Sequence, residues 1–215
     1  LVELLSGAQS LATAQVSCYG DTLAANVEFR KALPPGLYLL RATYQEDGQV
    51  RETYQTGLWS RDVKLLESGA ALRVRGDYFT KNGAPFLPFG TNYFSTDIYG
   101  SRFEDGGNAY VWDRDFAEME LHGVTFVRTG IWGGNADFVD RLTGGAEERF
   151  LRALEAYLHA AARHNIQVHF TFFAFDPQTI RRYPGQESFQ LGAGVNPYTD
   201  PVAIRAQKNY LYSIV

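Results

Sequence analysis

The feature that most constrains the fold is an alternation of strand-like and helix-like segments from about Tyr78 onward. Three short runs, near Phe89–Tyr93, Val124–Ile131 and Gln167–Phe173, are almost continuously apolar, which is typical of parallel strands covered on both faces. Parallel neighbours need a long crossover, and a helix-like segment follows each run. The order hairpin, strand, helix, strand, helix, strand, helix therefore predicts an α/β fold.

Two α/β folds fit this order: an open doubly wound sheet and the start of a (β/α)8 TIM barrel. No phosphate-binding G-x-G-x-x-G follows the first run, which argues against a nucleotide-binding doubly wound sheet. A hairpin at Lys81-Asn82-Gly83 precedes that run and would suit the bottom of a barrel. A full barrel has eight strand–helix units in about 250 residues, so residues 76–215 hold about three of them.

Capping signals mark the expected helices. Asp113 is the expected N-cap of the first helix, and Gly123 follows its last turn. The second helix runs from about 147 to 164, with Asn165 in the left-handed C-terminal position, and the third begins at Asp200-Pro201. The second helix has one apolar face at helical spacing, formed by Phe150, Leu151, Leu154, Tyr157, Leu158 and Ala161.

Residues 1–75 have a different pattern, with strand-like runs separated by turn signals. The runs are "ANVEFRKAL", "GLYLLRATYQEDGQVRETYQTGLW" and "AALRVRGDYF", and the second contains a hairpin turn at Asp47-Gly48. This spacing predicts a small antiparallel β-sandwich ahead of the barrel segment. The opening "LVELLSGAQSLATAQV" is either its first strand or the tail of an earlier segment. Because the sequence lacks a starting Met and stops inside an apolar helical pattern, we expect a piece of a longer chain.

Composition narrows the possible partners. A net charge of -4 without a basic stripe argues against nucleic acid. No apolar run approaches the roughly 20 residues of a membrane span. Cys18 is the single cysteine, so an internal disulfide is impossible. We expect no cofactor and no metal ion, and the sequence leaves the oligomeric state open.

The segments that follow the three strands are unusually long for strand–helix loops. They read "YFSTDIYGSRFEDGGNAYVW", "WGGNADFVDRLTGG" and "FAFDPQTIRRYPGQESFQLGAGVNPYTD", and they are rich in aromatic, Asn, Asp and Gly residues. Function in a TIM barrel resides at this end of the strands. Flat aromatic faces beside hydrogen-bonding groups suit sugar rings. The alternative is that these aromatic residues only pack the loops against one another.

Three polar residues share one phase on the predicted strands. Alternation places Arg128 on the same side as Phe126 and Gly130, facing the barrel interior, where a permanent charge needs a carboxylate partner. His169 has the matching position on the third strand, and Asn92 ends the first. We expect all three to converge on one pocket. The alternatives are a structural ion pair for Arg128, a core histidine at 169 and a turn-forming Asn92.

Four segments together resemble retaining glycoside hydrolases of clan A, in particular cellulase-like and β-mannanase-like family 5 enzymes and their β-galactosidase-like relatives. The segments are "GDYFTKNGAPFLPFGTNYF", "FVRTGIW", "VHFTFF" and "NPYTDPVAIRAQKNYLYSIV", and the resemblance covers roughly 72–215. It implies hydrolysis of β-linked poly- or oligosaccharides by two glutamates, about 5–5.5 Å apart. It also implies that Arg128 supports the nucleophile, and that Asn92, Tyr93, Trp132 and His169 bind substrate.

The sequence departs from that family pattern in one major respect. The family places its acid/base in an Asn-Glu pair after the fourth strand and its nucleophile on the seventh, and no Asn-Glu occurs in this sequence. Glu104 and Glu187 lie in the long loops, where solvation is the simpler interpretation. We therefore expect both catalytic glutamates beyond Val215 and no activity from this segment alone.

Two other functions stay open. One is a non-catalytic carbohydrate-binding protein on the same scaffold, and the other is a barrel enzyme with different chemistry. An Asn-Glu pair at the next strand end would favour the hydrolase, and its absence would favour the binding protein. Because polymeric glycans lie outside the cell, the resemblance implies a secreted or periplasmic protein.

Overall fold

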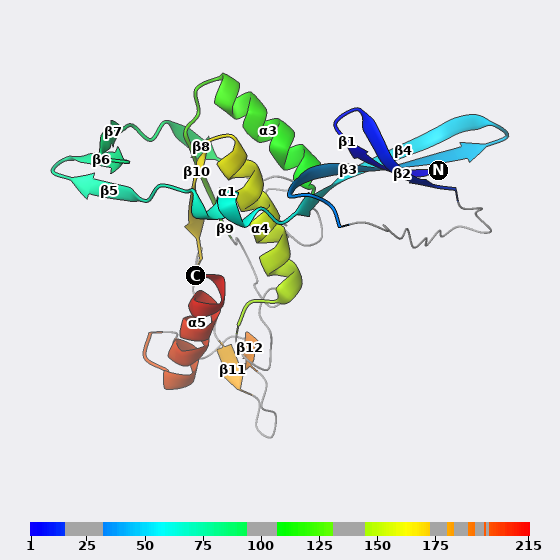
Figure 1. Cartoon of the computed structure of the whole chain (residues 1–215). Coiled ribbons are helices and arrows are strands. Elements are labelled where there is room, and N and C mark those ends of the chain that lie inside the picture. Colours follow the sequence, from blue (N-terminus) through cyan, green and yellow to red (C-terminus); the bar gives the residue numbers. More distant parts are fainter. Residues whose placement is uncertain are drawn as a thin grey trace.

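The computed structural model describes residues 1–15, 32–93, 107–130, 145–172, 180–182, 189–191, 196 and 198–215. They form a mixed α/β fold in which antiparallel sheets are followed by a small parallel sheet with helices (Figure 1). Among the described strands, the parallel sheet has three members and does not close into a barrel.

The N-terminal part forms one four-stranded antiparallel sheet in the order β2-β1-β3-β4. Its strands are β1 (Val2–Ser6), β2 (Gln9–Ala14), β3 (Gly36–Glu46) and β4 (Gln49–Ser60). The opening segment is thus a hairpin of this sheet, because β1 pairs with both β2 and β3. A second layer of the expected sandwich is not present among the described residues, and most of "ANVEFRKAL" lies outside them.

The predicted hairpin at Asp47-Gly48 is confirmed. Asp47 has a φ of 51° and Gly48 a φ of 74°, and positive φ at both central residues is what a type I′ hairpin turn requires. Its right-handed twist matches that of the flanking strands β3 and β4, which pair along their whole length.

A short helix and a three-stranded meander link the two parts of the chain. They are α1 (Val63–Glu67), β5 (Leu72–Arg75), β6 (Tyr78–Lys81) and β7 (Ala84–Phe86). The hairpin at Lys81-Asn82-Gly83 is confirmed, since it joins β6 to β7. The strand-like run "AALRVRGDYF" contains two strands, because Gly76 has a φ of 64° in the turn that joins β5 to β6.

The three predicted parallel strands are confirmed. They are β8 (Gly90–Asn92), β9 (Phe126–Gly130) and β10 (Gln167–Thr171), and β9 is central, parallel to both neighbours. The N-terminal sheet and the β5–β7 meander extend on opposite sides of this region (Figure 1).

Three longer helices follow the strands: α3 (Ala109–Leu121), α4 (Glu148–Arg163) and α5 (Pro201–Ile214). The C-terminal turn of α4 is as predicted, with Asn165 at a φ of 56°. The start of α5 is also confirmed, because the Asp200 side chain accepts hydrogen bonds from the N–H groups of Val202 and Ala203. Ahead of α5, β11 (Ile180–Arg182) and β12 (Phe189–Leu191) form an antiparallel pair.

The expected start of α3 at Asp113 was wrong. The N-cap lies five residues earlier, at Asn108, which accepts hydrogen bonds from the N–H groups of Tyr110 and Val111. Asp113 lies inside the helix and contacts His164 at the end of α4, with Oδ1 3.0 Å from Nε2. Gly123 follows the helix with a φ of 76°, as expected.

The core lies between one face of the parallel sheet and the helices α3 and α4. The predicted apolar face of α4 is confirmed, since Phe150, Leu154, Tyr157 and Ala161 are all buried. From the sheet, Val127 is fully buried and Thr129 is 2% exposed. Because alternate residues point to opposite faces, Phe126 and Arg128 face away from this helix layer.

Candidate functional site

Asn92, Arg128 and His169 form one row across the parallel sheet. Asn92 pairs with Arg128 on the neighbouring strand, and Arg128 pairs with His169 on the next. Paired residues of adjacent strands point to the same face, and this row has the phase opposite to buried Val127 and Thr129. The row therefore lies on the face of the sheet that α3 and α4 do not cover.

This face carries a cavity of about 660 Å³ that all three residues line. The described lining consists of Leu72, Phe79, Pro88, Gly90, Thr91, Asn92, Phe126, Arg128 and His169. Leu72 and Phe79 come from the meander, so the cavity extends from the hairpins to the polar row. Arg128 and His169 are middle residues of five-residue strands, so the cavity begins deeper in the sheet than the strand ends where we expected the cleft.

Arg128 is half-buried and is held by the neighbouring strand. Its Nε donates a hydrogen bond to Thr171 Oγ1 at 3.2 Å. Thr171 pairs with Gly130, where a Cβ atom would lie 2.3 Å from the Thr171 carbonyl oxygen. The glycine that follows Thr129 therefore lets β9 and β10 approach closely, which brings the threonine hydroxyl within reach of the guanidinium.

The polar groups of this cavity suit an oxygen-rich ligand. Arg128 offers only donors, while the amide of Asn92 and the ring of His169 can each donate or accept. The His169 ring lies edge-on to Phe126 with centroids 6.0 Å apart, which gives the cavity an apolar wall beside a polar one. The described lining contains no carboxylate, so these residues alone provide no carboxyl pair for acid–base hydrolysis.

Tyr93 does not lie in the row formed by Asn92, Arg128 and His169. We expected it to bind substrate, and its position disagrees with that role. It is buried in the core on the helix side, where its hydroxyl donates a hydrogen bond to Asp115 Oδ2 at 2.7 Å. Burial, together with that hydrogen bond, raises the pKa of Tyr93 far above its usual value. Adjacent residues of a strand point to opposite faces, so Tyr93 cannot share the face of Asn92.

The other expected residues fall outside the described ranges. These are Trp132, which we expected to stack on substrate, and the loop residues Glu104 and Glu187. Sequence reasoning missed the contribution of the meander residues Leu72 and Phe79, for which no local signal exists because their place depends on tertiary packing. The contact of Thr171 with Arg128 could have been predicted from the sequence, because Thr171 points to the same face of the sheet as His169.

No protein-family model matches this chain, and a search of curated protein sequences also finds no match. Within the described ranges, no group of three or more His, Cys, Asp or Glu side chains could hold a metal ion. In the same part of the chain, no helix is both long and apolar enough to cross a membrane.

Proposed function

We propose that this protein is a retaining glycoside hydrolase acting on β-linked poly- or oligosaccharides, and that the face bearing Asn92, Arg128 and His169 forms part of its substrate pocket. The observation that carries the proposal is the in-register row of these three side chains on the face of the parallel sheet that α3 and α4 leave uncovered. The resemblance of the sequence to clan A enzymes supplies the chemistry.

In this proposal the parallel sheet is the first part of a (β/α)8 barrel, and the face that α3 and α4 leave uncovered is the barrel interior. The β5–β7 meander lies below the barrel, and the N-terminal sheet is part of an accessory sandwich. One face of the sheet is apolar and covered by helices, and the other carries Arg128 and His169. This division suits a barrel, in which helices cover the outside and polar site residues lie inside. The protein is exported to reach polymeric glycans.

Arg128 has the role of holding the nucleophile glutamate ionised and oriented. A guanidinium is always charged and can bind a carboxylate through two parallel hydrogen bonds. Asn92 and His169 bind sugar hydroxyls beside it. Both glutamates come from strands outside this sequence, so the 215-residue chain alone should not hydrolyse glycosides.

A second candidate is a carbohydrate-binding protein without catalysis. It is favoured by the described lining of the cavity, which contains donors and aromatic rings but no carboxylate. Such a protein would need no residue beyond this face to recognise a sugar.

The two functions are separated by measuring turnover and binding together. The protein at its natural length and the 215-residue chain are each assayed on β-mannan, cellulose oligosaccharides and aryl β-glycosides, with binding followed by calorimetry. Hydrolysis by the natural-length protein, with the β-anomer released first in an NMR time course, supports the hydrolase. Saturable binding without turnover supports the binding protein. Neither binding nor turnover on any of these substrates contradicts both.

A further inference from the structure

The guanidinium of Arg128 reaches further along the sheet than its own backbone does. In the parallel register Arg128 lies opposite His169, whereas its Nε donates a hydrogen bond to Oγ1 of Thr171, the second residue after His169 on β10. Thr171 and its partner Gly130 are the last residues of β10 and β9. The side chain therefore carries its charge from the middle of the sheet toward the carboxyl ends of the strands, where a barrel keeps its reacting groups.

Gly130 makes this contact possible. It has the same phase on β9 as Arg128, so a side chain at this position would project from the same face of the sheet. That side chain would also strike the neighbouring strand, because a Cβ atom at Gly130 would lie 2.3 Å from the carbonyl oxygen of Thr171 and 2.7 Å from its Cβ. Any larger residue must therefore push Thr171 away from β9, which would break the 3.2 Å hydrogen bond to Arg128.

A threonine hydroxyl is well suited to hold an arginine in one orientation. A guanidinium has only donors, and the hydroxyl oxygen of Thr171 supplies an acceptor without adding a charge. Two heavy atoms on Cβ restrict the χ1 angle of threonine, so the strand itself fixes the position of Oγ1. Because the guanidinium is a rigid plane, a bond to Nε–H also sets the direction of its other N–H groups.

We propose that Thr171 is a positioning residue for Arg128, and that its hydroxyl, brought close by Gly130, aims the guanidinium at the nucleophile carboxylate. Donors that are already oriented stabilise charge in a reaction best, because they need no reorganisation. Thr171 is not part of the described cavity lining, so it acts through Arg128 and not on the substrate. Its effect on turnover rests on the proposed hydrolase function, whereas its hold on Arg128 does not.

The hold on Arg128 is tested by NMR of its Nε–H group in the isotope-labelled protein at its natural length. The signal is assigned by its absence from Arg128→Lys. Thr171→Val keeps the branched shape and removes the hydroxyl, so we expect the Nε–H proton to exchange with water about tenfold faster than in the wild type. Thr171→Ser retains the acceptor and should keep the slow exchange. Thr53→Val is the matched control, because Thr53 is an exposed threonine on β4 outside the cavity.

Turnover of an aryl β-glycoside tests the consequence for the reaction. Thr171→Val should lower kcat about tenfold with little change in KM, a smaller loss than in Arg128→Ala because the guanidinium is still present. Thr171→Ser should restore most of the rate. Adding Thr171→Val to Arg128→Ala should lower kcat no further, since Thr171 then has nothing left to position. Thr171→Ala serves in both experiments if Thr171→Val does not fold.

Two results would overturn this inference. One is unchanged Nε–H exchange of Arg128 in the folded Thr171 variant, and the other is an equal loss of kcat from that variant with and without Arg128. A wild type without turnover would instead contradict the proposed function, and the exchange rates alone would then decide whether Thr171 holds Arg128.

Discussion

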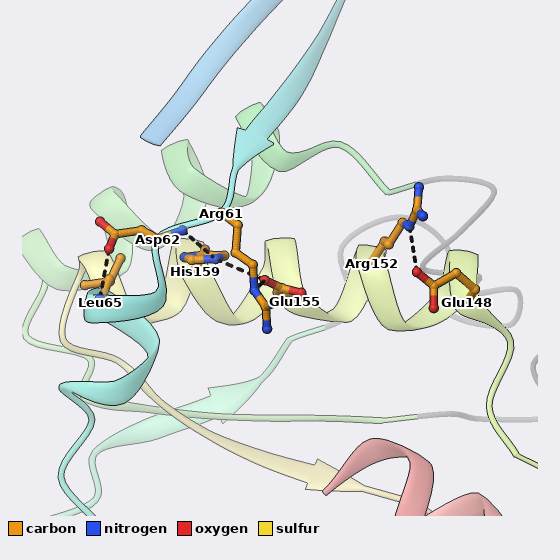
Figure 2. Close-up of polar contacts among 7 residues, drawn as sticks. All are labelled: Arg61, Asp62, Leu65, Glu148, Arg152, Glu155 and His159. Atoms are coloured by element: carbon orange, nitrogen blue, oxygen red, sulfur yellow. Dashed lines mark hydrogen bonds and ion pairs between the residues drawn. The ribbon is translucent and has the colours of Figure 1, made fainter. Parts of the chain in front are cut away.

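At the scale of single residues, Arg128 and His159 show two ways in which the fold accommodates a polar group. Arg128 is half-buried on the side of the sheet that α3 and α4 leave uncovered, and its Nε donates a hydrogen bond to Thr171 Oγ1. His159 lies fully inside the molecule between α4 and β4, where its ring packs on Trp59 and accepts from the Asp62 N–H (Figure 2). A buried ring of this kind is stable only while it is neutral.

The burial of His159 predicts a stability that depends on pH. Because its folded pKa is lowered, the unfolded chain binds the proton more readily. The contribution of the neutral ring to the free energy of unfolding is therefore complete above the unfolded pKa of about 6.5. It is lost as the pH falls from there through the lower pKa of the folded state. Urea unfolding at pH 7.5 and at pH 5.5 should show a loss in the wild type that is smaller in His159→Phe. An equal loss in both would show that other groups cause it.

The candidate site could be partly predicted at this scale. The phase of Asn92, Arg128 and His169 follows from the alternation of strand residues, and the structure places the three together. The same rule should have excluded Tyr93, whose neighbour Asn92 already takes the cavity face. The stacking of Trp59 on His159 could not be predicted, since it joins segments about 100 residues apart.

At the scale of elements, α3 shows how tertiary contacts choose between two capping residues. Both Asn108 and Asp113 are good N-cap residues by type. Asn108 is selected because its side chain also joins β4: Oδ1 accepts from the Gly57 N–H at 3.1 Å and Nδ2 donates to the Gln55 carbonyl at 2.9 Å. The phase of the strands and the ends of α4 and α5 were predictable because their sequence signals are local. The choice of Asn108 over Asp113 depends instead on β4, whose Gly57 lies 51 residues away.

We predict that Asn108→Ala destabilises the protein by about 0.5–2 kcal/mol for the helix cap, with a further loss from the contacts to β4. Asn108→Asp is the matched variant, because it keeps the capping oxygen and replaces the donor to the Gln55 carbonyl with a carboxylate oxygen. Urea denaturation followed by circular dichroism should place Asn108→Asp between the wild type and Asn108→Ala. Equal stability of all three proteins would show that the cap contributes nothing measurable.

At the scale of the whole molecule, the N-terminal sheet is seated on the helix layer through close backbone contact. A Cβ atom at Gly57 on β4 would lie 2.2 Å from the backbone nitrogen of Tyr110 at the start of α3. Trp59 continues this contact by packing on the core of α3 and α4, and Arg61 pairs with Glu155 on α4. The sheet and the α/β part therefore share one continuous interface.

Gly57→Ala should disturb that interface. The added methyl group meets backbone rather than a flexible side chain, so the sheet must shift, and we expect a loss of about 1–3 kcal/mol in the free energy of unfolding. Gly69→Ala is the control, because its Cβ would meet only the Leu66 carbonyl oxygen at 3.7 Å, an ordinary contact. Equal urea midpoints for the two variants would contradict this account of how the parts are joined.

The central claim is that the face with Arg128 belongs to a glycosidase pocket, and the most direct test is the kinetics of Arg128→Ala. Initial rates on an aryl β-glycoside are measured for the protein at its natural length, for this variant and for Arg163→Ala, an arginine on α4 outside the pocket. We predict that kcat falls by about 100-fold in Arg128→Ala with little change in KM, because the arginine acts on the nucleophile and not mainly on the bound sugar. Arg163→Ala should retain wild-type rates. An active wild type with undiminished kcat in folded Arg128→Ala would contradict the claim.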